Sequence, residues 1–303
     1  MTFEVTILGC SSASPSYHRH PSAQVLNIFE RFFLIDCGEG TQMQMDRYKI
    51  KAAKINRIFI SHLHGDHYLG LMGLLSTMHL QGRTKEMNIY APKELKEIIN
   101  IQLKFSQTIL RFPIVYHDIN PDKSEVIFED EMLAISTIIL KHRIQCTGFL
   151  FKEKKKPRKL IKEMVEKYAI PVEFMHRLKD GEDYHQGKKI VKNAELTTAA
   201  TPARSYAYCT DTIYDEQITD IIKGTNLLYH EATFMNDLLE RAKETYHTTC
   251  KQAGIIAKKA NVKKLVIGHF SARYKDLNPL LIEAQAEFPE TQLAVEGETF
   301  PVE

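Results

Sequence analysis

The first part of the chain alternates apolar and polar residues in short runs, which is typical of β-strands. Runs rich in β-branched and aromatic residues cover residues 3–9, 23–28, 32–36 and 55–62. The short interval between the second and third runs predicts a β-hairpin. After the fourth run, apolar residues recur at helical spacing over 68–80, and Asp66 lies where such a helix would be capped.

The rest of the chain alternates predicted strands with predicted helices. The strands are expected at 87–92, 112–119, 125–130, 132–140, 205–212, 225–232, 263–269 and 291–298. The helices are expected at 93–106, 216–224, 250–262 and 278–288. Consecutive strands followed by this alternation favour an α/β fold of two stacked sheets with helices outside, a four-layer αββα sandwich. Composition alone would equally allow an ordinary doubly wound sheet.

Residues 152–193 interrupt this pattern. The segment opens with KEKKKPRK, continues with a helix-like LIKEMVEKYAI, and is otherwise polar, with few positions that predict a core. We expect one domain over residues 1–303, with this segment inserted as a protruding basic arm.

Composition narrows the classes of protein that fit. The chain has 303 residues, of which 44% are hydrophobic, and a net charge of +2, so any nucleic-acid-binding surface must be local. Its five cysteines are scattered without a CxxC pair, which favours reduced thiols over disulfides or a cysteine zinc cluster. The first residues lack the pattern of a signal peptide, and no apolar run predicts a membrane span. We expect a cytoplasmic protein.

The segment SHLHGDH concentrates the candidate chemistry. His62 and His64 are two residues apart at the end of a predicted strand, so both imidazoles can face one ion. Asp66 and His67 follow a glycine and point differently, which favours a second ion beside the first. An isolated histidine is usually structural, but four such ligands within six positions indicate a metal site.

Three distant residues at predicted strand ends can complete the coordination of two ions. They are His142, Asp211 and His269. Nitrogen and oxygen ligands from separate parts of the chain suit a borderline metal ion with open coordination. We assign His62, His64, His142 and Asp211 to one ion, and Asp66, His67, His269 and the bridging Asp211 to the other. For His142 taken alone, a structural role is the alternative.

Two neighbouring ions would acidify a shared water and stabilise an in-line displacement, which indicates hydrolysis of an ester, amide or phosphodiester. The sequence contains no Walker loop, GxGxxG or GxSxG motif, and HEATF at residues 230–234 lacks the second histidine of HExxH.

Together with ILGCSSASPS and FLIDCGEGTQMQM near the start, the motifs SHLHGDH, CTDT, LLYHEATF, YHTT and GHFSARY resemble the short form of ribonuclease Z. That family belongs to the metallo-β-lactamase fold superfamily. The resemblance implies an endonuclease that removes the 3′ trailer from precursor tRNA and leaves a 3′-hydroxyl. It also implies two zinc ions (Zn2+) per chain on the same seven ligands, and a homodimer.

Further roles come from the same resemblance. Asp66 is the expected proton acceptor for the attacking water, and His247 of YHTT matches an additional active-site histidine that can stabilise phosphate charge or protonate the leaving group. Glu231 is a hypothetical partner that orients His247, with local capping as the alternative. Arg273 is a candidate phosphate contact, with a plain surface role as the alternative.

In that family a flexible arm grips the tRNA, and residues 152–193 occupy the same interval. The candidate contacts are Lys154, Lys155, Lys156 and Arg158. Phosphate contacts by such residues give an affinity that falls with salt. A solvated charged loop is the alternative.

Two other functions fit the metal cluster. One is a dinuclear-metal phosphodiesterase of the same fold that acts on small or cyclic nucleotides, against which the basic insertion argues. The other is a non-catalytic RNA-binding module, against which the complete ligand set argues.

Overall fold

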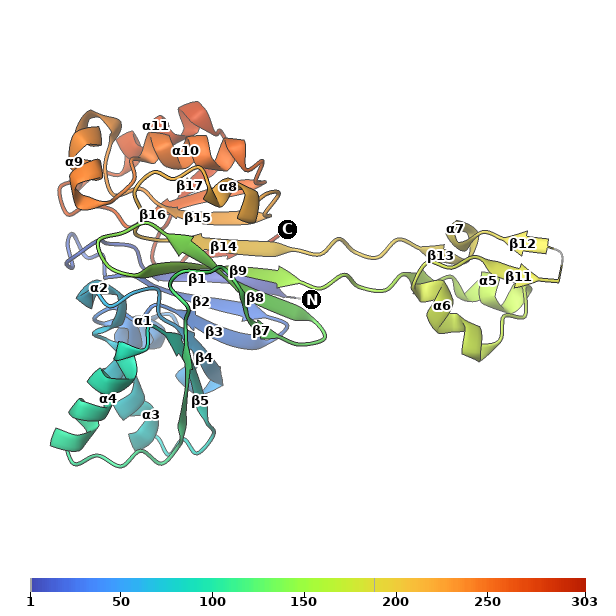
Figure 1. The fold of residues 1–303 in the computed structure, drawn as a ribbon, viewed down its shortest axis with the longest axis horizontal. Helices are drawn as coiled ribbons and strands as arrows, with labels where there is room; N and C mark the ends of the chain where they lie inside the picture. The colour runs from blue at the N-terminus through green and yellow to red at the C-terminus, as the bar shows by residue number, and fades with distance from the viewer. Residues whose placement is uncertain (1, 188) are drawn as a thin grey trace. The chain divides into compact units, whose positions relative to one another are not determined.

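The computed structural model describes residues 2–187 and 189–303, and two seven-stranded sheets dominate it (Figure 1). The first sheet has the order β18-β1-β2-β3-β4-β5-β6. Its strands are β1 (Phe3–Gly9), β2 (Ala23–Ile28), β3 (Arg31–Ile35), β4 (Ile55–Phe59), β5 (Met87–Ala91), β6 (Ile114–Asp118) and β18 (Thr299–Pro301). Strands β18 to β3 pair antiparallel, which includes the predicted hairpin, whereas β3 to β6 pair parallel.

The second sheet has the order β17-β16-β15-β14-β9-β8-β7. Its strands are β7 (Val126–Glu129), β8 (Leu133–Leu140), β9 (Cys146–Glu153), β14 (Ser205–Cys209), β15 (Leu227–Glu231), β16 (Lys264–Gly268) and β17 (Thr291–Leu293). Strands β14 to β17 pair parallel, so their carboxyl ends meet at one edge, where ligands commonly bind in such sheets.

Helices cover the outer faces of both sheets (Figure 1). The α-helices of the larger unit are α1 (Thr41–Arg47), α2 (Gly65–Tyr68), α3 (Leu71–Leu80), α4 (Glu94–Phe105), α8 (Ile218–Ile221), α9 (Leu239–Thr245), α10 (Cys250–Lys259) and α11 (Asn278–Glu287). Helices α1, α3 and α4 share one apolar core with the first sheet, and α10 and α11 lie over the second. This is the four-layer arrangement that the order of elements predicts. None of the described helices combines the length and apolarity needed to cross a membrane.

An aromatic layer joins the inner faces of the two sheets. Phe59 of the first sheet lies edge-on to Phe149 and Phe151 of the second, with ring centroids 5.3 and 5.4 Å apart. Such contacts add specific geometry to a large buried apolar area. Both partners come from β9, a central strand that the sequence pattern did not predict. This packing fixes β4, whose carboxyl end leads into the histidine cluster.

Residues Lys152–Ala203, together with Glu129–Ala134, form a second compact unit. It contains β10 (Lys159–Leu160), α5 (Lys162–Lys167), α6 (Met175–Lys179), β11 (Tyr184–Gln186), β12 (Lys189–Val191), α7 (Asn193–Leu196) and β13 (Thr197–Thr198). Ile170, Leu178, Val191 and Leu196 make a small core of its own. The sequence pattern, with few apolar positions, did not indicate this core.

Candidate metal centre

The carboxyl ends of the strands deliver most of the predicted ligands. Asp211 follows β14 by two residues, His142 follows β8 by two, and His269 follows β16 directly. His62 and His64 lie in the turn between β4 and α2. The helix predicted over 68–80 is α3, whose N-cap is Gly70, and the N-cap of the short α2 before it is His64, so the expectation that Asp66 caps a helix is wrong. Asp66 lies inside the first turn, and its side chain faces the histidines.

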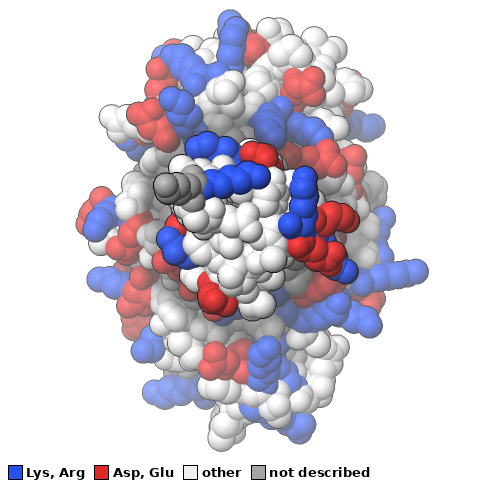
Figure 2. Space-filling model, turned by 90° about the vertical axis from the view of Figure 1, so that its right-hand side faces the viewer, with Lys and Arg blue, Asp and Glu red and all other residues white. Residues whose placement is uncertain are grey.

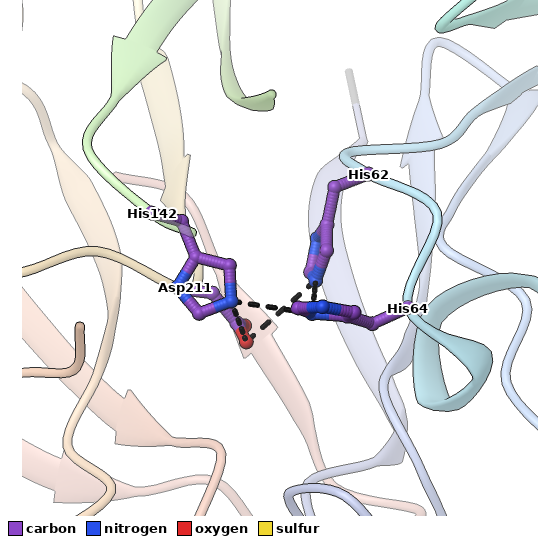
Figure 3. Close-up of side chains that lie close together, drawn as sticks. All are labelled: His62, His64, His142 and Asp211. Atoms are coloured by element: carbon purple, nitrogen blue, oxygen red, sulfur yellow. Dashed lines mark hydrogen bonds and ion pairs between the residues drawn. The ribbon is translucent and has the colours of Figure 1, made fainter. Parts of the chain in front are cut away.

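Four side chains converge from three loops to form a first ligand group, His62, His64, His142 and Asp211 (Figure 3). Nδ1 of His64 lies 3.1 Å from Nε2 of His62 and 3.2 Å from Nε2 of His142. Bonds of about 2.0–2.1 Å to a tetrahedral zinc ion separate ligand nitrogens by roughly 3.3 Å. Both separations therefore fit nitrogens that bind one ion.

Asp66, His67 and His269 form a second group beside the first. Oδ2 of Asp66 lies 3.4 Å from Nε2 of both histidines. Asp211 links the two groups with different oxygens. Its Oδ1 lies 3.2 Å from Nε2 of His67 and of His269, whereas its Oδ2 lies 3.7 Å from Nε2 of His62 and of His142. Each oxygen of Asp211 therefore faces a different pair of histidines.

Hydrogen bonds to the far ring nitrogens orient the histidines. Nδ1 of His67 lies 2.7 Å from Oδ2 of Asp36, and Nδ1 of His269 lies 3.0 Å from Oγ1 of Thr233. Since the Thr233 hydroxyl donates to Glu231, its oxygen accepts from His269 and leaves Nε2 free to bind an ion. Sequence reasoning missed Asp36 and Thr233. Asp36 directly follows β3, so the strand-end rule that found Asp211 could have found it.

The charges of the cluster suit cations. Burial lowers the pKa of His62, so this imidazole stays neutral with a free lone pair. Burial alone would raise the pKa of Asp211, but His269 and His67 hold it well below its usual range. Burial would likewise raise the pKa of Asp66, and His67 is the main group that lowers it. Burial would lower the pKa of His67, but the Asp211 and Asp66 carboxylates raise it well above its usual range, so His67 must lose a proton to coordinate a metal, whereas His62 and the carboxylates already have the form that does so.

One buried atom tests the fit to a metal. Nε2 of His67 is fully buried and has no hydrogen-bond partner among the described residues, although carboxylate oxygens of Asp66 and Asp211 lie 3.2–3.4 Å away. Buried polar atoms are rarely left without a partner. An imidazole and two carboxylates aimed at one point suit a divalent cation, and the mixed nitrogen and oxygen donors suit zinc.

His247 lies beside the ligands and pairs with Glu231. Nδ1 of His247 lies 2.8 Å from Oε1 of Glu231, the pairing that the sequence suggested as a hypothesis. Burial lowers the pKa of His247, but the Glu231 carboxylate outweighs it and raises the value to about 9. The backbone N–H groups of Thr212 and Thr233 also donate to Glu231, which fixes the pair. The imidazolium is placed to meet negative charge.

A cleft of about 460 Å³ opens over the predicted metal ligands. Three exposed arginines line it, Arg143, Arg241 and Arg273. Only Arg273 was a candidate from the sequence. Arg143 directly follows a ligand and Arg241 lies on α9, and neither position carries a motif. Their guanidinium groups make the cleft suitable for an anionic chain.

The other predicted substrate contacts lie in the smaller unit. Lys154 pairs with Glu129 at 2.8 Å, Lys156 with Glu153 at 3.5 Å, and Nε of Arg158 donates to Thr197 at 2.7 Å. Lys155 is exposed. On the face shown in Figure 2, basic and acidic side chains are interspersed.

Comparisons with known proteins identify the family of the chain. A family model described as Anti-Pycsar protein Apyc1 matches residues 3–155, a stretch that ends before Asp211, His247 and His269. The Ribonuclease Z of Bacteroides fragilis (strain YCH46) is 48% identical over 296 residues, which cover 97% of each chain. The chain belongs to the ribonuclease Z family.

Solved structures agree with this membership. Human tRNase Z, short form (ELAC1), is 28% identical, with a TM-score of 0.72 over 99% of each chain. The metallo-β-lactamase fold protein YhfI of Bacillus subtilis is 18% identical, with a TM-score of 0.70 over 99% of this chain and 100% of its own, which shows the fold alone. The predicted family and fold class are confirmed, and the chain is an endoribonuclease.

Proposed function

We propose that the protein is a zinc-dependent endoribonuclease that cuts precursor tRNA 3′ of the mature end and releases the 3′ trailer. The observation that carries this function is the position of Asp211 in an arginine-lined cleft. One of its carboxylate oxygens faces the first ligand group, and the other oxygen faces the second. Membership of the ribonuclease Z family directs this chemistry to the 3′ end of tRNA.

Two zinc ions per chain would be held by His62, His64, His142 and Asp211, and by Asp66, His67, His269 and Asp211. When bound, they supply Lewis-acid charge and make water more acidic. The chain's own residues handle the protons. Asp66 accepts a proton from the attacking water while the oxygen of that water forms a bond to phosphorus.

His247 acts at the opposite end of the displacement. As an imidazolium, it stabilises charge on the phosphate and donates its Nε2 proton to the 3′ oxygen when the phosphorus–oxygen bond breaks. Glu231 holds Nδ1 of His247 and so aims Nε2 into the cleft. The products are a tRNA with a 3′-hydroxyl and a trailer with a 5′-phosphate.

Arginines of the cleft and basic residues of the smaller unit bind the RNA. Arg143, Arg241 and Arg273 contact phosphates near the scissile bond, where a planar guanidinium matches phosphate oxygens. Lys154, Lys155, Lys156 and Arg158 contact the body of the tRNA as part of an arm. The enzyme works in the cytoplasm as a homodimer, in which the arm of one subunit presents tRNA to the site of the other.

Cleavage of two substrates tests this function. We expect the zinc-loaded protein to cut a precursor tRNA far faster than a chromogenic phosphodiester, and chelation to abolish both reactions because the ions are required. Rapid turnover of the small diester with no cleavage of precursor tRNA would instead support a small-substrate phosphodiesterase.

A further inference from the structure

A tight hairpin that directly follows the cleft-lining Pro15 presents an aromatic side chain to solvent. Ser16 and Arg19 pair through both of their backbone N–H groups, at 3.1 and 2.9 Å, which leaves Tyr17 and His18 as a two-residue turn. Both have positive φ, 50° for Tyr17 and 63° for His18. Turns of this kind favour Asn and Gly, whereas bulky residues with positive φ are strained and often lie at ligand contacts.

Contacts at the base of the hairpin hold it against the catalytic loops. Ser11 bridges to Pro21 and to Phe270, and the Arg19 guanidinium donates to the carbonyl of Tyr274 at 2.6 Å. The segment from Phe270 to Tyr274 also contains Arg273, which lines the cleft. The strained turn is therefore presented by a fixed scaffold and not by a loose loop.

The hairpin also reaches the reacting centre. The backbone N–H of Ala13 donates to Oδ2 of Asp66 at 2.8 Å, and Ser12, Ala13 and Pro15 line the cleft. Four peptide steps separate Ala13 from Tyr17, which places Tyr17 within about 14 Å of Ala13. An RNA strand whose phosphate lies at Asp66 would pass Tyr17 within a few nucleotides.

Tyr17 is suited to stack on a base. Half of its surface is exposed (50%), and the Arg19 guanidinium lies 5.3 Å from the ring centroid, which steadies the ring. Aromatic rings beside basic residues bind single-stranded nucleic acid by stacking, independent of sequence. We propose that Tyr17 is a stacking platform for an unpaired nucleobase within a few nucleotides of the scissile phosphate, an inference that rests on the proposed function.

Two substitutions separate the ring from the turn. Tyr17→Asn removes the ring but suits a positive φ, so the thermal unfolding midpoint should not fall. Tyr17→Phe keeps the ring and is the matched control. We expect Tyr17→Asn to raise the KM for precursor tRNA by about fivefold or more, and Tyr17→Phe to change it by less than about twofold.

Precursors with a single abasic nucleotide near the cut identify the base. If Tyr17 stacks on one particular base, removing that base should raise the KM of the wild type. The same precursor should not raise the KM of Tyr17→Asn any further. Equal KM values for Tyr17→Asn and Tyr17→Phe would overturn the proposal, as would a loss confined to kcat, which would mean that the turn acts through Ala13 on Asp66. A wild-type protein that fails to cut precursor tRNA would refute the proposed function instead.

Discussion

At the scale of single residues, Asp66 contacts three parts of the site, at Ala13, His67 and His269. Its Oδ2 accepts from the N–H of Ala13 at 2.8 Å and lies 3.4 Å from both His67 and His269. We expect Asp66→Ala to slow cleavage by about 10³-fold or more, because it removes a ligand and the proton acceptor together. Single-turnover rates measure this loss, and filter binding should show that precursor tRNA still binds.

Glu39 offers a control for Asp66. It is an exposed acid that lines the same cleft but lies outside the ligand groups, so Glu39→Gln should leave the rate nearly unchanged. An equal loss of RNA binding in Asp66→Ala would contradict its role as a proton acceptor.

The pair of His247 and Glu231 makes the rate depend on pH. Glu231 overcomes the effect of burial and raises the pKa of His247 to about 9, so the proton is present at neutral pH and lost as the pH rises. We expect kcat to fall on the alkaline side. Bound cations add positive charge, which moves the fall below that value without changing its direction.

Glu231→Gln tests this cause. Without the carboxylate the pKa of His247 falls, so the alkaline limb of the pH–rate profile should move to lower pH while the metal content stays the same. A profile that coincides with that of the wild type would show that His247 does not supply the proton.

At the scale of elements, strand ends explain how much of the site could be predicted. His62, Asp211 and His269 could be predicted from the sequence because the periodicity located β4, β14 and β16. In parallel sheets, ligand-binding residues gather at the carboxyl ends of the strands. Thr233 and Arg241 could not be predicted from the sequence, because their roles depend on which loops fold back over the sheet. Strand β9 was missed because its run of CTGFLFKE leads directly into the basic segment.

Asp36 directly follows the predicted strand β3, but its contact with His67 was not predicted. Its Oδ2 accepts from Tyr208 at 2.7 Å and lies 2.7 Å from Nδ1 of His67. Partners of this kind keep a ligating imidazole oriented and basic, so Asp36→Asn should weaken metal binding by about 10- to 100-fold. Competition with a chelator measures the affinity. Tyr208→Phe, which keeps the carboxylate, should have the smaller effect, and equal effects would contradict this role.

At the scale of the whole molecule, the net charge is only +2, so affinity for RNA has to come from local groups of basic residues. Lys152, Lys155 and Lys159 are exposed in the smaller unit. We expect their joint replacement by alanine to lower the slope of log affinity against log salt by about 2 for precursor tRNA, because fewer counterions are released. Hydrolysis of a chromogenic phosphodiester should not change.

Three exposed lysines of the α4 region provide the matched control, Lys93, Lys96 and Lys104. They carry the same charge in the larger unit, and their replacement should leave the slope nearly unchanged. An equal change in both triple variants would mean that the smaller unit has no special part in binding RNA.

The most direct test of the function is to map the ends produced from a precursor tRNA by the purified, zinc-loaded protein. Attack by water with departure of the 3′ oxygen should give a single cut at the mature end, a tRNA with a 3′-hydroxyl and a trailer with a 5′-phosphate. A 2′,3′-cyclic phosphate on the tRNA, or cuts scattered along the trailer, would contradict the proposed hydrolysis at the histidine and aspartate cluster.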